Sequence, residues 1–274
     1  MQFTGTDKYY LDPELGAIVN MAIALEKPLL LTGEAGTGKT QLAFEISRSL
    51  GMPIEVLRCK STIKGEEACY VQDTVLRLND ARFGTDGTGR DVHEFFDYVI
   101  WGPIGRAFRA DERTVLLLDE IDKTESDVQD NLLDVLEDCE FTIREVNRTI
   151  RAETKPVILV TSNAKRELSD PFLRRCFCHH IAFPTPEQMR EIVALHFRDL
   201  DQGLLDSALA IFYELRQKGF EKPPATSELL HWLAALRHEK VTPERLNVPF
   251  VGTLLKRTED LLAYRDEMAG AKLH

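Results

Sequence analysis

The sequence predicts an α/β protein, with a doubly wound parallel sheet in residues 1–185 and a small all-α domain in residues 186–274. Three short runs of almost purely apolar residues lie in the first part, at residues 28–32, 114–118 and 156–161. Each run is too short for a buried helix, and such runs are typical of parallel strands that are covered on both faces. Helical patterns separate the runs, which is the order expected of a doubly wound sheet.

The helices of the first part are predicted from the helical spacing of apolar residues and from a residue pair that favours the start of a helix. Apolar residues recur at helical intervals over residues 11–25, and Asp12-Pro13 forms a helix-start signal ahead of them. The first apolar run ends in a glycine cluster, after which a second helical pattern covers residues 40–50. A third pattern covers residues 127–138. These elements read as helix, strand, glycine loop and helix, followed by further strands with helices between them.

The second part is predicted to be entirely helical. Pro184 and Pro186 interrupt the pattern at the boundary, and no apolar run of comparable strength follows. The sequence predicts four helices there, at residues 187–197, 204–218, 226–237 and 251–268. In the first part, residues 79–91 carry three glycines among Asp, Thr and Arg, a composition that favours a mobile surface loop.

Composition indicates a globular protein of the cytoplasm. Of 274 residues, 43% are hydrophobic and 29% charged, and no stretch approaches the ~20 consecutive apolar residues that a membrane helix needs. The first residues lack the pattern of a signal peptide. The five cysteines are odd in number and scattered, so we expect free thiols in a reducing compartment. The formal charge of −11 is a poor match to a nucleic-acid binder, and we expect a protein partner instead.

The strongest functional signal follows the first apolar run. The sequence Gly33-Glu34-Ala35-Gly36-Thr37-Gly38-Lys39-Thr40 matches the phosphate-loop pattern G-x-x-x-x-G-K-[ST] at every fixed position. Because a helix opens here, its N–H groups and its dipole would converge on phosphate oxygens. Lys39 would reach the β- and γ-phosphates, and the Thr40 hydroxyl would bind Mg²⁺. The sequence therefore predicts a site for ATP and Mg²⁺, formed by the residues from Gly33 through Thr40 and by the next residue, Gln41.

Polar residues also follow the other two apolar runs. Asp119 and Glu120 come after the second run, at the sheet edge where ligands of open α/β folds bind. Asp119 would complete the Mg²⁺ site, and Glu120 would polarise the attacking water. Asn163 follows the third run and could hold that water together with Glu120. Taken singly, the acids could form a solvated turn and the asparagine could simply begin a turn. Their order beside the phosphate loop favours catalytic roles.

This order of motifs, with paired arginines and a helical lid behind it, resembles the AAA+ superfamily. The details resemble its MoxR branch, and residues 152–176 are similar to the CoxD-like proteins that accompany carbon-monoxide dehydrogenase maturation. The resemblance covers nearly the whole chain and is most specific over residues 28–183. It implies an ATPase core with a helical lid that assembles as a ring, expected to be a hexamer. It also implies remodelling of a partner protein, typically one with a von Willebrand factor A domain.

The same resemblance gives expectations for several arginines. Arg175 stands at the position of the family's arginine finger and would reach the ATP site of the neighbouring subunit, with Arg174 as the alternative. A surface pair that closes a helix is the simpler interpretation. Many MoxR relatives open a lid helix with an arginine that touches the γ-phosphate, whereas this chain has Thr226-Ser227-Glu228 there. Either another basic residue such as Arg237 serves instead, or the protein works without that contact.

Further alternatives remain at this point. Residues 176–180 contain Cys176, Cys178 and His180, which could bind a metal but are better explained as one face of a last core strand with buried cysteines. Residues 59–77 fall where the family inserts a hairpin, which could grip a client or be an ordinary surface hairpin. A DNA-directed AAA+ motor or clamp-loader-like subunit is the second functional hypothesis. A nucleotide switch that does not hydrolyse ATP is the third.

Overall fold

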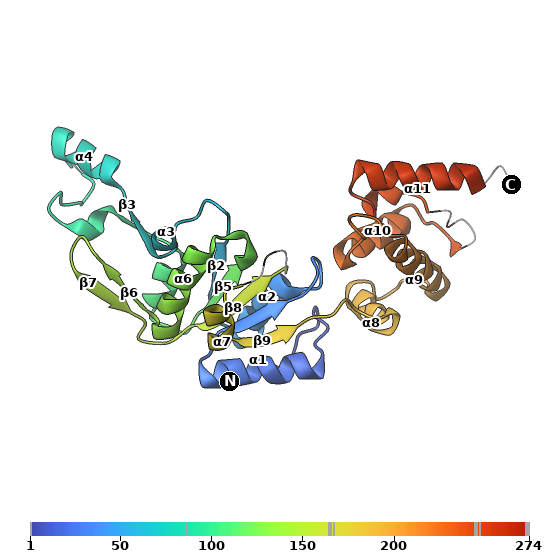
Figure 1. The fold of residues 1–274 in the computed structure, drawn as a ribbon, viewed down its shortest axis with the longest axis horizontal. Coiled ribbons are helices and arrows are strands. Elements are labelled where there is room, and N and C mark those ends of the chain that lie inside the picture. The colour runs from blue at the N-terminus through green and yellow to red at the C-terminus, as the bar shows by residue number, and fades with distance from the viewer. Residues whose placement is uncertain are drawn as a thin grey trace. The chain divides into compact units, whose positions relative to one another are not determined.

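The computed structural model describes residues 2–85, 87–163, 166, 168–243, 246 and 248–271. The chain divides into two compact units (Figure 1). The first consists of Met1–Thr6, Leu11–Gly33 and Lys39–Ile181, and the second of Asp7–Tyr10, Glu34–Gly38 and Ala182–His274. The domain boundary placed at residue 185 from the sequence stays a prediction.

A five-stranded parallel sheet forms the centre of the first unit, with the strand order β2-β5-β8-β1-β9. The three apolar runs are its inner strands, as predicted, because they are the segments that can be buried on both faces. These strands are β1 (Leu29–Thr32), β5 (Val115–Asp119) and β8 (Val157–Ser162). The edges are β2 (Ile54–Arg58) and β9 (Phe177–His180).

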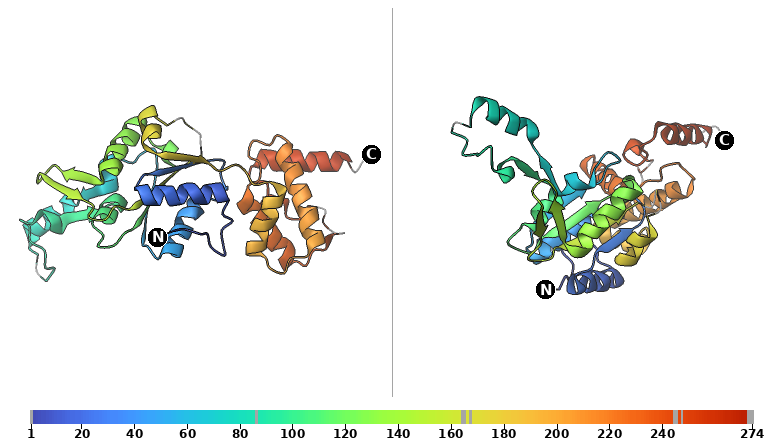
Figure 2. Two further views of the ribbon diagram at one scale, coloured as in Figure 1. Left: turned by 90° about the horizontal axis from the view of Figure 1, so that it is seen from below. Right: turned by 60° about the vertical axis from the view of Figure 1, so that its left-hand side comes forward.

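Helices pack around this sheet, and α1 lies beside edge strand β9 (Figures 1 and 2). The start of α1 (Pro13–Leu25) is fixed by Asp12, whose carboxylate accepts hydrogen bonds from the N–H groups of Glu14 and Leu15. The remaining helical segments of the first unit are α2 (Lys39–Leu50), α3 (Gly65–Cys69), α4 (Thr74–Phe83), α5 (Pro103–Phe108), α6 (Ser126–Asp138), α7 (Asp170–Arg175) and the 3₁₀ turns η1 (Phe95–Tyr98) and η2 (Ile121–Lys123).

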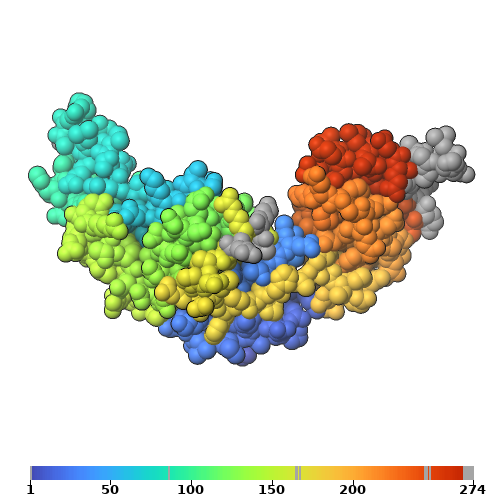
Figure 3. Space-filling view, in the orientation of Figure 1, coloured from blue at the N-terminus to red at the C-terminus, as the bar shows by residue number. Residues whose placement is uncertain are grey.

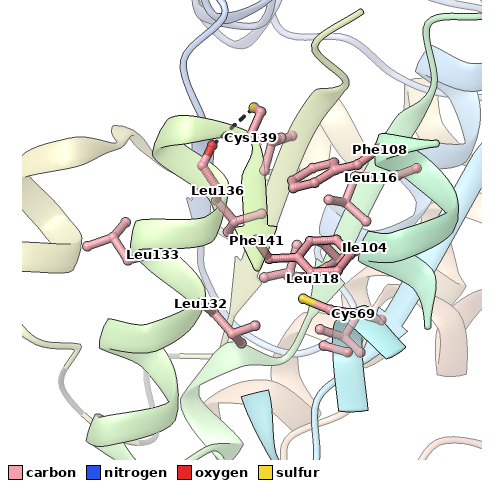
Figure 4. Close-up of a cluster of buried hydrophobic side chains, with 14 of the residues drawn as sticks. Cys69, Ile104, Phe108, Leu116, Leu118, Leu132, Leu133, Leu136, Cys139 and Phe141 are labelled. Atoms are coloured by element: carbon pink, nitrogen blue, oxygen red, sulfur yellow. Dashed lines mark hydrogen bonds between the residues drawn. The ribbon is translucent and has the colours of Figure 1, made fainter. Parts of the chain in front are cut away.

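An apolar core lies between the sheet and helices α5 and α6 (Figure 4). Leu116 and Leu118 of β5 are fully buried there, together with Ile104 of α5. The hairpin of β6 (Glu140–Ile143) and β7 (Arg148–Arg151) contributes Phe141. Burying side chains of this size stabilises the fold by roughly 1.5–3 kcal/mol each. This packing fixes β5, the strand that ends in Asp119.

The hairpin predicted within residues 59–77 has a different form. The antiparallel partner of β3 (Tyr70–Gln72) is β4 (Val99–Trp101), which lies much further along the chain, and α4 and η1 connect the two strands. The prediction of a local hairpin was therefore wrong, because residues 65–69 fold into α3 and leave no local partner strand. The result is an arm, residues 70–101, that projects from the first unit (Figures 2 and 3).

The segment predicted as a mobile glycine loop is partly helical. Helix α4 continues to Phe83, and Asp80 within it is buried. Its carboxylate accepts hydrogen bonds from the Arg90 guanidinium at 2.8 Å and from the Tyr98 hydroxyl at 2.9 Å. The glycine-rich stretch is thus closed at its base by a partly buried ion pair between Arg90 and Asp80, which its composition did not reveal.

The second unit contains the predicted helices, with one difference at the end. The helices α8 (Pro186–His196), α9 (Gln202–Gln217) and α10 (Thr226–His238) match the expected segments. The predicted helix at residues 251–268 was wrong at its start, because a 3₁₀ turn, η4 (Val251–Thr253), and buried Leu254 and Leu255 precede α11 (Thr258–Ala271). Glu259 and Asp260 give α11 the acidic first turn that a helix N-terminus favours. None of the helices within the described ranges is long and apolar enough to span a membrane.

The close approach of α5 to α3 depends on a glycine. A Cβ atom at Gly105 would lie 2.1 Å from the carbonyl oxygen of Cys69, so Gly105→Ala must push the two backbones apart. We expect a loss of about 1–3 kcal/mol in the free energy of unfolding, measured by urea denaturation. Gly65→Ala is the control, since a Cβ there meets its nearest neighbour at an ordinary 3.7 Å. Equal stability of the two variants would contradict this packing.

Candidate nucleotide-binding site

The predicted site residues of the first unit gather at one edge of the sheet. Gly33 follows β1, Asp119 ends β5, and Asn163 follows β8. Because these strands are parallel and adjacent, their carboxyl ends open on the same side. Ligands of open α/β sheets bind at this edge.

The glycine loop has the backbone that its sequence predicts. Gly36 and Gly38 have φ angles of 81° and 91°, in a region that side chains rarely adopt. The loop is closed locally by the Thr37 hydroxyl, which donates to the Glu34 carbonyl oxygen at 3.0 Å, with Ala35 and Gly36 between these two residues. Lys39 is the first residue of α2, so the loop leads into a helix N-terminus, where N–H groups favour anions.

Lys39 is held inside this loop. Its side chain is buried, with 5% of its surface exposed, and its ammonium donates to the carbonyl oxygen of Gly33 at 2.9 Å. A buried ammonium on a backbone carbonyl carries a positive charge that a phosphate oxygen can share.

Asp119 joins three elements through one carboxylate oxygen. Its Oδ1 atom accepts a hydrogen bond from the Thr40 hydroxyl at 2.7 Å and a second one from the Thr161 hydroxyl, also at 2.7 Å. Thr161, which is only 1% exposed, accepts in turn from the N–H group of Glu120 at 2.9 Å. The sequence prediction placed Thr40 and Asp119 together, and the structure does so directly.

This set of donor atoms fits magnesium. A hydroxyl and a carboxylate are hard oxygen ligands, and Mg²⁺ is usually held by one or two protein groups together with substrate phosphates and waters. Thr40 and Asp119 would hold the ion here. Elsewhere in the described part of the chain, no three His, Cys, Asp or Glu side chains come together as a metal site.

Glu120 adopts a backbone conformation that is unusual for its residue type. Its φ and ψ angles are 59° and 51°, in the left-handed region, where strain is characteristic of functional sites. This bend directs its carboxylate towards Asn163, whose side-chain amide donates to Glu120 Oε1 at 3.0 Å. The Lys123 ammonium is bonded to the other oxygen, and this hydrogen bond raises the pKa of Lys123.

Buried groups surround Asp119 and Glu120. The N–H group of Asn163 donates to buried Asp122 at 3.2 Å, and the N–H group of Cys59 donates to the Asp119 carbonyl oxygen at 2.9 Å. Burial raises the pKa of the Cys59 thiol to about 12, and the carboxylates of Asp119, Asp122 and Glu120 add to the shift. Cys59 is therefore a neutral thiol at physiological pH.

Sequence reasoning missed Thr161, Asp122 and Lys123 as parts of this site. A signal for Thr161 was present, since alternate residues of a strand point to the same face and Thr161 stands two residues before Asn163. The contact of Gln41 with the nucleotide stays a prediction, and its side-chain amide donates to Glu45 at 2.6 Å. Glu45 is fully buried and also binds Thr6 and Arg48.

The paired arginines lie at the end of α7. The Arg175 guanidinium forms ion pairs with Asp134 at 2.8 Å and with Glu137 at 2.9 Å, both on α6. Arg174 beside it is exposed. Both remain candidates for an arginine finger.

The helix that opens with Thr226 uses its acid as a cap. The carboxylate of Glu228 accepts hydrogen bonds from the Ala225 N–H group and from the Ser227 hydroxyl, which is the geometry of a helix start. Arg237 is exposed in the last turn of the same helix. Another arginine of the second unit, Arg216, forms an ion pair with the carboxylate of Glu34 at 2.7 Å.

The cysteines near residue 177 are less buried than predicted. Residues 177–180 do form a strand, β9, but Cys178 and His180 are exposed and Cys176 is intermediate. The expectation of a buried core face was wrong because β9 is an edge strand. His180 contacts the Thr32 hydroxyl through Nδ1 at 3.1 Å.

The fold and the site together define a phosphate-loop nucleotide-binding protein of the AAA+ class. Residues 28–176 match the model of the AAA domain family, dynein-related subfamily, and the chain belongs to this family. No curated protein sequence matches the chain.

Solved structures with a similar fold include the Thermotoga maritima RuvB Holliday junction branch migration motor. It is 17% identical with a TM-score of 0.54, over 93% of this chain and 71% of that one. A proline-to-glycine mutant of T. maritima RuvB is 18% identical with a TM-score of 0.54, over 92% and 71% of the two chains. At this level of identity, the likeness concerns the fold.

The two hydrogen bonds of Thr161 give a test of the site. Thr161→Val keeps the shape of the side chain but leaves the Glu120 N–H group without its acceptor and removes one donor from Asp119. We expect the free energy of unfolding to fall by about 1–3 kcal/mol and Mg-ATP binding to weaken, measured by denaturation and by titration calorimetry. Thr142→Val, which removes an exposed Thr–Thr contact, is the control. Unchanged stability and binding in Thr161→Val would contradict this role.

Proposed function

We propose that this protein is a magnesium-dependent ATPase that works in a ring of identical subunits. The observation that carries the proposal is the pair of contacts at the sheet edge, Thr40 with Asp119 at 2.7 Å and Asn163 with Glu120 at 3.0 Å. They bring the groups suited to metal binding and to water activation together at one edge of the sheet, where α2 begins. Membership of the AAA family supports the same conclusion.

Each group has a distinct task in this reaction. The N–H groups of the glycine loop and the Lys39 ammonium would bind and orient the phosphates. When bound, Mg²⁺ supplies charge neutralisation for the β- and γ-phosphates, held by Thr40 and Asp119. Glu120 would accept a proton from the water that attacks the γ-phosphate, yielding ADP and inorganic phosphate. Asn163 fixes the Glu120 carboxylate and would orient that water.

The work done by the ring is proposed from the resemblance to MoxR proteins. Hydrolysis would drive remodelling of a partner protein, of the type that contains a von Willebrand factor A domain, during maturation or cofactor insertion. The formal charge of −11 supports a protein partner over a nucleic acid. The ring would be a hexamer in the cytoplasm, with an arginine of α7 completing each neighbouring site.

A substitution at Glu120 can distinguish ATP binding from ATP hydrolysis. Glu120→Gln keeps the shape of the side chain but cannot accept a proton, so we expect phosphate release to fall by about 10²-fold or more while Mg-ATP binding persists. A phosphate-release assay and a fluorescent-nucleotide titration would measure the two effects. Glu125→Gln, an exposed acid with a long surface ion pair, is the control. Full turnover in Glu120→Gln would refute the assigned role, and absence of Mg-ATP binding by the unaltered protein would refute the proposal.

The class of partner needs a separate experiment. Purification of the Glu120→Gln variant from the native host in the presence of ATP should retain a partner that turnover would release. Recovery of a von Willebrand factor A domain protein is the expected result. ATPase stimulation by DNA, with a steep dependence on salt, would instead identify a DNA-directed motor.

A further inference from the structure

The start of α10 lies against the glycine loop, within the same compact unit. A Cβ atom added to Gly36 would lie 2.6 Å from the Cβ atom of Ala225, the residue that precedes the helix. It would also lie 3.6 Å from the backbone nitrogen of Thr226 and 3.7 Å from the Ser227 hydroxyl oxygen. Because Gly36 also has a φ angle of 81°, a larger residue there would meet both strain and a clash. The first turn of α10 thus borders the loop that is proposed to bind the phosphates.

This helix start holds a carboxylate where an external anion would otherwise bind. A helix N-terminus presents unpaired N–H groups and favours negative charge, and the methyl group of Ala225 cannot accept a hydrogen bond from them. Glu228 supplies the negative charge instead. Its carboxylate accepts hydrogen bonds from the N–H group of Ala225 at 3.2 Å and from the Ser227 hydroxyl at 2.8 Å. The acid is therefore one hydrogen bond away from a hydroxyl that borders Gly36.

The nearby arginine does not compensate this acid. The Arg216 guanidinium forms an ion pair with Glu34 at 2.7 Å and donates to the carbonyl oxygen of Pro224 at 2.6 Å. Its charge is thus balanced by an acid of the glycine loop itself. Glu228 forms no ion pair with a basic side chain in the ranges that the structure describes. A further phosphate at the loop would face this unpaired carboxylate, and like charges at short range repel each other.

A buried hydroxyl at the same helix start has no partner. Thr226 is 9% exposed, and its Oγ1 atom forms no hydrogen bond with any described residue. An unpaired buried hydroxyl costs stability, so the arrangement with Glu228 in place leaves a donor unused. A phosphate oxygen at the start of α10 would give this hydroxyl an acceptor.

We infer that the Glu228 carboxylate competes with the γ-phosphate of ATP for the start of α10, and that it lowers the affinity of the site for ATP relative to ADP. The inference rests on the proposed function, since it assigns nucleotide selectivity to that same site. ATP gains the helix start only when the hydrogen bonds of Glu228 to Ala225 and Ser227 break, and Thr226 then donates to the phosphate. ADP lacks the γ-phosphate and leaves Glu228 in place.

Removal of the charge at Glu228 tests this competition. E228Q keeps an oxygen that can accept from the Ala225 N–H group, so we expect Mg-ATP to bind about 10-fold more tightly and Mg-ADP to change by less than about threefold. Competition titrations against a fluorescent nucleotide, on a Glu120→Gln parent so that ATP is not consumed, measure both constants. E187Q, which alters an exposed acid in the first turn of α8, is the matched control. An unchanged ratio of the ATP and ADP constants in E228Q would overturn the inference.

Thr226 gives a second readout. T226V keeps the shape of the side chain and removes the unpaired hydroxyl, so we expect the nucleotide-free protein to become more stable to heat while Mg-ATP binds roughly fivefold to 20-fold more weakly. Thr114→Val removes another buried hydroxyl without a described partner, in the first unit, and should stabilise the protein with no change in nucleotide binding. A T226V variant that binds Mg-ATP as tightly as its parent would overturn the phosphate contact of Thr226.

A purely structural role of Glu228 would give another pattern. If the acid only capped α10, E228A would lower the midpoint of thermal unfolding, E228Q would not, and the ratio of ATP to ADP affinity would stay the same in both. A parent protein that binds neither nucleotide would refute the proposed function itself. A parent protein that binds both nucleotides, with a ratio that these variants leave unchanged, would refute only the competition.

Discussion

The Asp119 carboxylate is the interaction on which the site depends. One of its oxygens binds Thr40 on the helix after the glycine loop and Thr161 on the neighbouring strand, each at 2.7 Å. A carboxylate at the end of a buried strand needs such donors, because an unpaired charge there would be costly. The same hydrogen bonds hold the start of α2, β5 and β8 in one arrangement. The position of the candidate catalytic groups is therefore a consequence of satisfying this one acid.

The register of the sheet makes these hydrogen bonds possible. Leu118 of β5 stands opposite Val160 of β8, so the next residues, Asp119 at the end of β5 and Thr161 within β8, lie at the same level. A shift by one residue would turn Thr161 to the other face and force the side chains on both buried faces of β5 to repack. Because Leu116, Leu117 and Leu118 are fully buried, such a shift is strongly disfavoured. The apolar core thus fixes a polar contact at its edge to within a hydrogen-bond length.

The sequence predicted the parts of this arrangement that are local. The glycine loop, the inner strands and the acids after β5 follow from short patterns whose physical meaning does not depend on distant residues. The arm was missed because β3 pairs with β4, a distant segment with no pattern of its own. The exposure of Cys178 was missed because the position of β9 at the edge of the sheet depends on the strand order. Thr161 was passed over because a threonine has many ordinary roles in a strand.

Some of the acidic side chains of the protein have a structural role, because those of α6 hold α7 in place. The acids of α6 bind Ser169 and Arg175 at the two ends of α7, and β9 follows α7 directly. β9 pairs with β1, the strand that leads into the glycine loop. A displacement of α7 must therefore break its contacts with α6 or carry β9 along the edge of β1. Because packed interiors resist small deformations, helix α7, which bears the two arginines, is mechanically connected to β1, the strand that precedes the glycine loop of the same chain.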